Sequence, residues 1–140
     1  MSRIFWDTNL YIYLFEDYGA LSEATAGLRA RMLTRGDQLL TSALTLGEIL
    51  VKPMGQGNLT LCARYERALL DISILIPFDV KAAKVYAALR QDRGIRPPDA
   101  VQLSCAAAAG TDVFITNDKR LQGKRVPGIQ FVVPLEQAPL

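Results

Sequence analysis

Four carboxylates are the residues of this sequence whose type and spacing could do chemistry. Asp7 and Asp118 follow short apolar stretches, Glu48 lies within an expected helix, and Asp99 stands at the expected start of another. Two unit charges about 4 Å apart repel by about 4 kcal/mol at an effective dielectric constant of about 20. If the fold brings these acids together, it therefore needs bound cations or raised pKa values.

The ligand types indicate which metal such a site would hold. The sequence contains no histidine, and its two cysteines, Cys62 and Cys105, stand far apart. Oxygen ligands alone suit Mg²⁺ or Mn²⁺, and the lack of histidine excludes Ser–His and Cys–His nucleophiles. We therefore expect phosphodiester hydrolysis, in which the metal activates water for in-line attack and leaves 3′-hydroxyl and 5′-phosphate ends.

The elements that must position these acids alternate along the chain. Apolar runs at 3–6, 38–41, 72–77, 113–116 and 129–133 predict five strands. Helical patterns separate most of them, at 9–15, 22–35, 43–51, 59–70, 79–90 and 99–109. This alternation predicts one α/β domain over residues 1–140, a three-layer α/β/α fold with a central parallel sheet. Because ligands bind at the carboxyl ends of parallel strands, the acids should meet there.

Each acid also has a purely structural explanation. Asp7 could cap the helix that follows it, and Thr45 to Glu48 matches a capping box. Asp99 could complement a helix dipole, and Asp118 could form a turn. Asp79 also follows an apolar run, but we interpret it as an N-cap outside the metal set.

Composition indicates an ordinary globular protein. Of 140 residues, 50% are hydrophobic and 21% are charged, and the net charge is +2. The longest apolar runs fall short of a membrane span, and Asp7 stands where a signal peptide needs an apolar core. We expect a soluble cytoplasmic protein with no membrane partner and with reduced, buried thiols.

Four sequence blocks contain the acids and their neighbours: Phe5–Asn9, Ser42–Glu48, Pro97–Leu103 and Val113–Asp118. In order, spacing and coverage of nearly the whole chain, these blocks resemble the PIN domain family of small metal-dependent nucleases.

The resemblance implies a role for each acid. Asp7 and Asp99 would be the central ligands of Mg²⁺ or Mn²⁺, and Glu48 and Asp118 would bind directly or through water. All four would be catalytic. Second-shell candidates at the same sheet edge are Thr8, Asn9, Thr116 and Asn117.

A site that admits a polyanion should also be rimmed by positive side chains. For each of them, an ordinary solvated surface charge is the alternative. The nucleic-acid-binding candidates are Lys52, Arg93, Arg96, Lys119 and Arg120.

The compact chain further resembles the VapC-type toxin subunit of type II toxin–antitoxin pairs. That resemblance implies an endoribonuclease with an RNA substrate, a cognate antitoxin and a homodimeric assembly. Two alternatives stay open: a free-standing PIN nuclease acting on RNA or DNA without a toxin role, and a non-catalytic module that binds RNA or protein.

Overall fold

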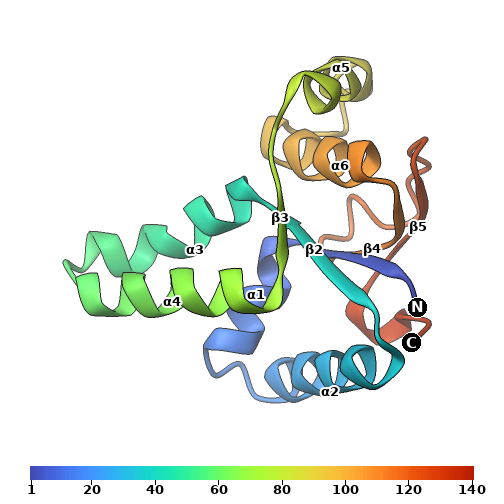
Figure 1. Cartoon of the computed structure of the whole chain (residues 1–140). Helices are drawn as coiled ribbons and strands as arrows, with labels where there is room; N and C mark the ends of the chain where they lie inside the picture. Colours follow the sequence, from blue (N-terminus) through green and yellow to red (C-terminus); the bar gives the residue numbers. More distant parts are fainter.

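Five parallel strands form one sheet in the computed structural model, which describes every residue from 1 to 140 (Figure 1). The strand order is β3-β2-β1-β4-β5, and all four pairings are parallel, as predicted. Alternate residues of β1 face opposite sides, so Phe5 joins one core and Ile4 and Trp6 join the other. The strands are β1 (Arg3–Trp6), β2 (Gln38–Ser42), β3 (Ile74–Ile76), β4 (Thr111–Ile115) and β5 (Ile129–Val133).

Helices cover both faces of the sheet, which confirms the predicted three-layer α/β/α fold (Figure 1). The pair α5 and α6 lies on one face, and α1 and α2 lie on the other. No helix combines the length and the apolar character needed to cross a membrane. The helices are α1 (Thr8–Phe15), α2 (Ala20–Arg35), α3 (Ala43–Gly55), α4 (Leu59–Ile72), α5 (Val80–Leu89) and α6 (Pro97–Ala109), with a short 3₁₀ helix η1 (Leu135–Gln137).

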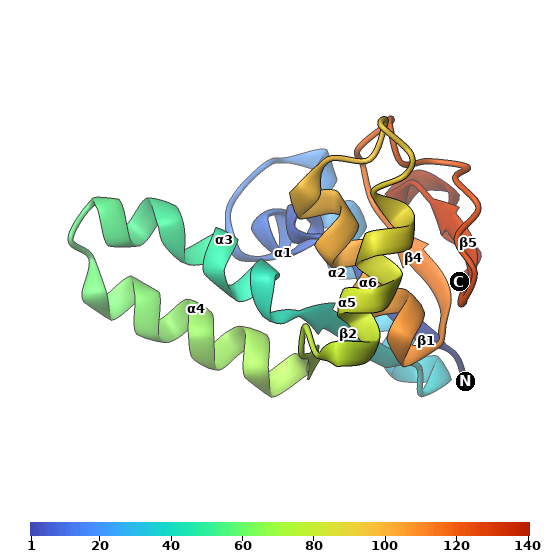
Figure 2. The ribbon, with the colours of Figure 1, turned by 90° about the horizontal axis from the view of Figure 1, so that it is seen from above.

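Helices α3 and α4 form a hairpin that extends away from the sheet (Figures 1 and 2). The predicted end of α3 before Pro53 is wrong, because the helix continues to Gly55 and buries Pro53. A proline near a helix end removes a single helical hydrogen bond. Packing of α3 against α4 therefore outweighs that loss.

The strand order reverses direction beside β1. Strands β2 and β3 extend from one side of β1, whereas β4 and β5 extend from the other. In such a sheet the carboxyl ends of the two strands at the reversal open a crevice. Asp7 follows β1 at this point, and its backbone N–H donates to the Ile115 carbonyl of β4 at 3.0 Å.

Candidate metal centre

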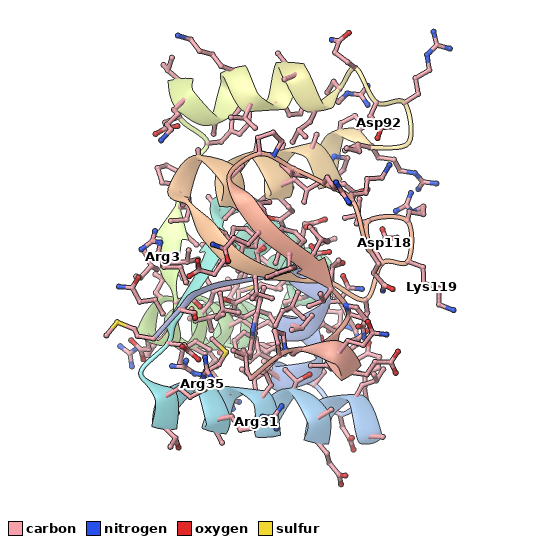
Figure 3. The ribbon with its side chains drawn as sticks, turned by 90° about the vertical axis from the view of Figure 1, so that its right-hand side faces the viewer. Arg3, Arg31, Arg35, Asp92, Asp118 and Lys119 are labelled. Atoms are coloured by element: carbon pink, nitrogen blue, oxygen red, sulfur yellow. The ribbon has the colours of Figure 1, made fainter.

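One pocket at the carboxyl edge of the sheet is lined by all four predicted acids. It encloses about 420 Å³ and is bordered by Asp7, Glu48, Asp99 and Asp118. Thr8, Asn9 and Gln102 are among its other lining residues. Figure 3 shows Asp118 at the opposite end of the sheet from Arg3, which begins β1.

Asp7 is the most deeply placed of these acids. Its side chain is buried, with Oδ1 accepting from the Thr8 backbone N–H at 2.8 Å and Oδ2 accepting from the Thr116 hydroxyl at 2.7 Å. Burial raises its pKa to about 6, and the charges of Asp99 and Glu48 add to that rise, while the two hydrogen bonds oppose it. Asp7 caps α1, but one capping bond does not account for a buried carboxylate that has no cationic partner.

Glu48 reaches across the pocket to helix α1 rather than back along its own helix. Its Oε1 accepts from the Thr8 hydroxyl at 2.6 Å. The N-cap of α3 is Ser42, so Thr45 and Glu48 do not begin the helix as a capping box would require. Thr8 thus links the first residue of α1 to helix α3 through one side chain.

A network of buried polar side chains holds the Thr8 hydroxyl in place. Gln102 of α6 donates from Nε2 to the hydroxyls of Thr8 at 3.0 Å and Thr45 at 2.8 Å, and its Oε1 accepts from the Ser42 hydroxyl. Thr41 donates to Thr45 at 2.8 Å. Sequence reasoning missed Gln102, although a glutamine inside an alanine-rich helix was the available indication.

Asp99 and Asp118 share a guanidinium. Arg120 contacts both carboxylates, with Nη2 3.5 Å from Asp99 Oδ2 and a closer pairing to Asp118. This pairing lowers the pKa of Asp118. The pKa of Asp99 is raised, first by burial and then by the charge of Asp118. Arg120 therefore offsets part of the negative charge on the outer side of the pocket.

The four residues expected to orient the acids occupy different positions. Thr8 and Thr116 are buried against the acids, and Thr116 Oγ1 also accepts from the Asp118 backbone N–H at 3.0 Å. Asn9 is exposed on the pocket wall. Asn117 lies outside this pocket, because its Oδ1 accepts from the Leu135 backbone N–H at 3.1 Å and its side chain lines the neighbouring pocket.

The candidate cations divide in a similar way. Lys52 pairs with Glu16 at 3.2 Å, and Arg120 is held by the two acids. Arg93 and Arg96 are exposed. The charge of Arg96 partly opposes the rise in the pKa of Asp99 that burial causes, and it adds to the lowering of the Asp118 pKa by Arg120. Lys119 is exposed next to Asp118 (Figure 3).

The donor set fits a hard divalent cation by type. No three acidic or cysteine side chains already converge on one point as a formed metal site would. However, Asp7 has no cationic partner, and Glu48 and Asp99 line the same pocket. Arg120 engages both oxygens of Asp118, so this pairing would have to open for an ion to bind Asp118. Carboxylate oxygens are the ligands that Mg²⁺ and Mn²⁺ prefer.

Comparison with known proteins identifies similar sequences and structures. The family model of the PIN domain matches residues 4–126, whereas no curated protein sequence matches the chain. A chain of VapBC2 from Rickettsia felis, bound to a promoter DNA fragment, is similar with a TM-score of 0.75 and 18% identity, covering 94% of this chain and 98% of that one.

Two further solved structures are similar over most of their length. DNA-bound VapBC from Salmonella typhimurium has a TM-score of 0.70 and 20% identity, covering 96% of this chain and 99% of that one. A toxin–antitoxin complex from Klebsiella pneumoniae has a TM-score of 0.61 and 25% identity, with coverages of 90% and 94%. The identities of 18% and 20% establish a shared fold.

Proposed function

Because the chain belongs to the PIN domain family, we propose that it is a metal-dependent endoribonuclease and the toxin of a toxin–antitoxin pair. The observation that carries the proposal is the buried Asp7 carboxylate, which faces three further acids where the strand order reverses. A buried carboxylate without a cation beside it is costly to ionise. A divalent cation held by Asp7 and the neighbouring acids would offset that cost.

Each acid has a proposed task in this site. Asp7 and Asp99 would hold the metal directly, and Glu48 and Asp118 would hold it directly or through water. Bound Mg²⁺ or Mn²⁺ would supply the Lewis acid that activates water and neutralises charge at the scissile phosphate. The choice of RNA over DNA rests on the resemblance to VapC-type toxins.

The surrounding side chains orient the acids. Thr116 fixes one oxygen of Asp7, and Thr8 fixes one oxygen of Glu48. Gln102 holds Thr8 in turn. Arg120 sits at the outer acids and can turn toward an entering phosphate, while Arg96 and Lys119 provide exposed positive charge nearby.

The toxin role and its partners are supported by the structural relatives. The Klebsiella pneumoniae relative, at 25% identity, is a toxin–antitoxin complex, and the other two are VapBC assemblies. By extension this chain would bind a cognate antitoxin, form a homodimer, and act in the cytoplasm. Its two cysteines are free and buried, which suits a reducing compartment.

Cleavage of a mixed RNA pool tests the proposal. The purified chain should cut RNA with Mg²⁺ or Mn²⁺ and not with a chelator, and Asp7→Asn should abolish cutting. Asp79→Asn is the matched control, because Asp79 caps α5 and lies outside the pocket. RNA cleavage that survives chelation would refute the assignment of the four acids as metal ligands. Cleavage that is lost equally in a folded Asp79→Asn variant would refute it as well.

A pull-down tests the toxin role separately. The chain should capture the product of a short reading frame that adjoins its own gene, and that product should suppress RNA cleavage. A metal-dependent ribonuclease that is indifferent to this product would be a free-standing PIN nuclease. A folded chain that binds RNA and never cuts it would be a binding module.

A further inference from the structure

A hollow on the surface lies beside β5, outside the pocket of the four acids. It encloses about 850 Å³ between β5 and the segment 122–127 that precedes it. Strand β5 borders the sheet (Figure 1), so this groove opens along an edge. We refer to it as the β5 groove.

The segment that forms the wall of the β5 groove is anchored by packing and hydrogen bonds. Leu121 is buried, and the Gly123 backbone N–H donates to the Val132 carbonyl of β5 at 3.2 Å. Lys124 pairs with Asp92 at 2.8 Å. Gly128 has a φ of 98°, and a Cβ there would lie 2.7 Å from the Ala107 carbonyl oxygen, so only glycine lets this segment approach α6 closely.

The lining of the β5 groove has the chemistry of a single-stranded nucleic-acid site. Its lining residues include two basic side chains, Lys124 and Arg125, and no acidic side chain. Arg125 is exposed and forms no ion pair. Phe131 of the edge strand β5 leaves 59% of its surface exposed, so its ring is accessible to a ligand. Three glutamines complete the polar lining: Gln122, Gln130 and Gln137.

These groups match the parts of a single RNA strand. Guanidinium and ammonium groups contact phosphates, an exposed aromatic ring stacks on an unpaired base, and amides can bond base edges. Lys124 is already paired with Asp92, so the unpaired guanidinium of Arg125 provides the positive charge that a polyanion requires. A peptide partner would gain nothing from that one-sided charge unless it were acidic.

A second pocket adjoins the β5 groove and is lined in part by the two sequence neighbours of Asp118. It shares Gln122 and Pro134 with the β5 groove. It also contains Asn117 and Lys119, which flank Asp118 of the carboxylate pocket. The adjoining pocket holds one base, Lys119, and one acid, Glu136. A strand whose phosphate lies at the acids can therefore continue past Lys119 into the groove.

We propose that the β5 groove is an extended substrate site that binds nucleotides of single-stranded RNA beyond the scissile phosphate, with Phe131 stacking on a base and Arg125 contacting phosphate. This rests on the proposed ribonuclease function. The groove would give the enzyme a preference for unpaired RNA long enough to span both pockets, which the carboxylate pocket alone would not provide.

Binding without cleavage is the first measurement. In the Asp7→Asn background, fluorescence anisotropy compares labelled oligouridines of about 4 and about 16 nucleotides. Adding Phe131→Ala should lower the affinity for the longer RNA about tenfold, as expected for the loss of one stacking contact. The affinity for the shorter RNA should not change. Phe131→Tyr should restore affinity. Phe78→Ala is the matched control, since Phe78 is also exposed but lies outside the groove.

Salt dependence tests the charge. Arg125→Ala should lower the slope of log affinity against log salt by about 1 for the longer RNA. Arg67→Ala, on the outer face of α4, should not change it. In the active enzyme, Phe131→Ala should reduce kcat/KM for long RNA by the same factor as the affinity.

The outcomes separate the two proposals. If the unsubstituted chain cuts RNA but the Phe131 and Arg125 variants bind and cut both lengths normally, the groove proposal alone is overturned. If the unsubstituted chain neither cuts nor binds RNA, the proposed ribonuclease function is overturned and the groove proposal with it. If Phe131→Ala changes self-association by light scattering and leaves RNA affinity intact, the groove is a protein interface and the proposal is wrong.

Discussion

Replacing Asp7 with asparagine should stabilise the metal-free protein while destroying its activity. The carboxylate is buried, and burial raises its pKa from 3.8 to about 6. At about 1.4 kcal/mol for each tenfold change in ionisation, that rise corresponds to about 3 kcal/mol of stability lost when the folded protein must hold the charge.

The geometry sets how much of this energy the variant recovers. An asparagine oxygen can still accept from the Thr8 N–H, and its amide can donate to the Thr116 hydroxyl, where Asp7 Oδ2 now accepts. Weaker bonds to a neutral amide cost about 1 kcal/mol. We therefore expect a net gain of about 2 kcal/mol above pH 7, which raises Tm by roughly 5 °C.

The stability difference between Asp7→Asn and the parent should depend on pH in a defined direction. Because the folded-state pKa is the higher one, the protonated form favours folding. The stability of the unsubstituted protein is thus fully retained below pH 3.8, declines as the pH rises through about 6, and then levels off. The difference between the variant and the parent should be smallest at low pH and reach its full size above the folded-state pKa.

The assay is urea unfolding of both proteins in chelator across this pH range. Asp37→Asn is the control, because Asp37 is also buried but accepts from Arg35 Nε at 2.8 Å and the Ser2 N–H at 2.7 Å. Removing its charge should destabilise the protein. An Asp7 variant that is no more stable than its parent at neutral pH, or whose advantage ignores pH, would refute the electrostatic reasoning.

Three other predictions follow from the site and its surroundings. At a hundredfold excess over Kd, Mg²⁺ or Mn²⁺ should stabilise the parent by about 2.7 kcal/mol and so raise its Tm. Neither ion should raise the Tm of Asp7→Asn, and equal shifts in both proteins would place the ion elsewhere. Gln102→Leu should lower kcat about tenfold with little change in KM, because Thr8 loses a partner, whereas Ser104→Ala removes only a local bond to Val101 and should keep full activity. Asp79→Ala should cost about 1 kcal/mol in urea unfolding through loss of the α5 cap and leave RNA cleavage intact; a folded but inactive variant would show that the metal set is incomplete.

Local sequence patterns accounted for the strands and for most of the helices. The apolar runs predicted five parallel strands, and β5 has the predicted bounds, Ile129–Val133. Asp79 caps α5 as predicted, with its side chain accepting from the Ala82 N–H. These features depend on residues a few positions apart, so periodicity and capping chemistry reveal them. The parallel arrangement then placed Asp7 and Asp118 at one edge.

Contacts between distant segments could not be read in this way. The Thr8–Glu48 hydrogen bond joins residues 40 positions apart, and the Thr116–Asp7 bond joins residues 109 apart. The sequence allowed a capping box for Glu48, and only the packing of α3 against α1 directed it to Thr8. The same holds for the projecting α3–α4 hairpin and for the Gln102 network.

The residue types thus indicated a cluster of carboxylates and predict Mg²⁺ or Mn²⁺ as the ion that it would hold, because ligand chemistry is a property of side chains wherever they lie. Side-chain direction depends instead on packing across the sheet. Packing turned Asn117 toward Leu135, placed Arg120 between two acids, and opened the β5 groove beside an exposed Phe131. Such arrangements minimise the free energy of the whole chain, and no short stretch of sequence specifies them.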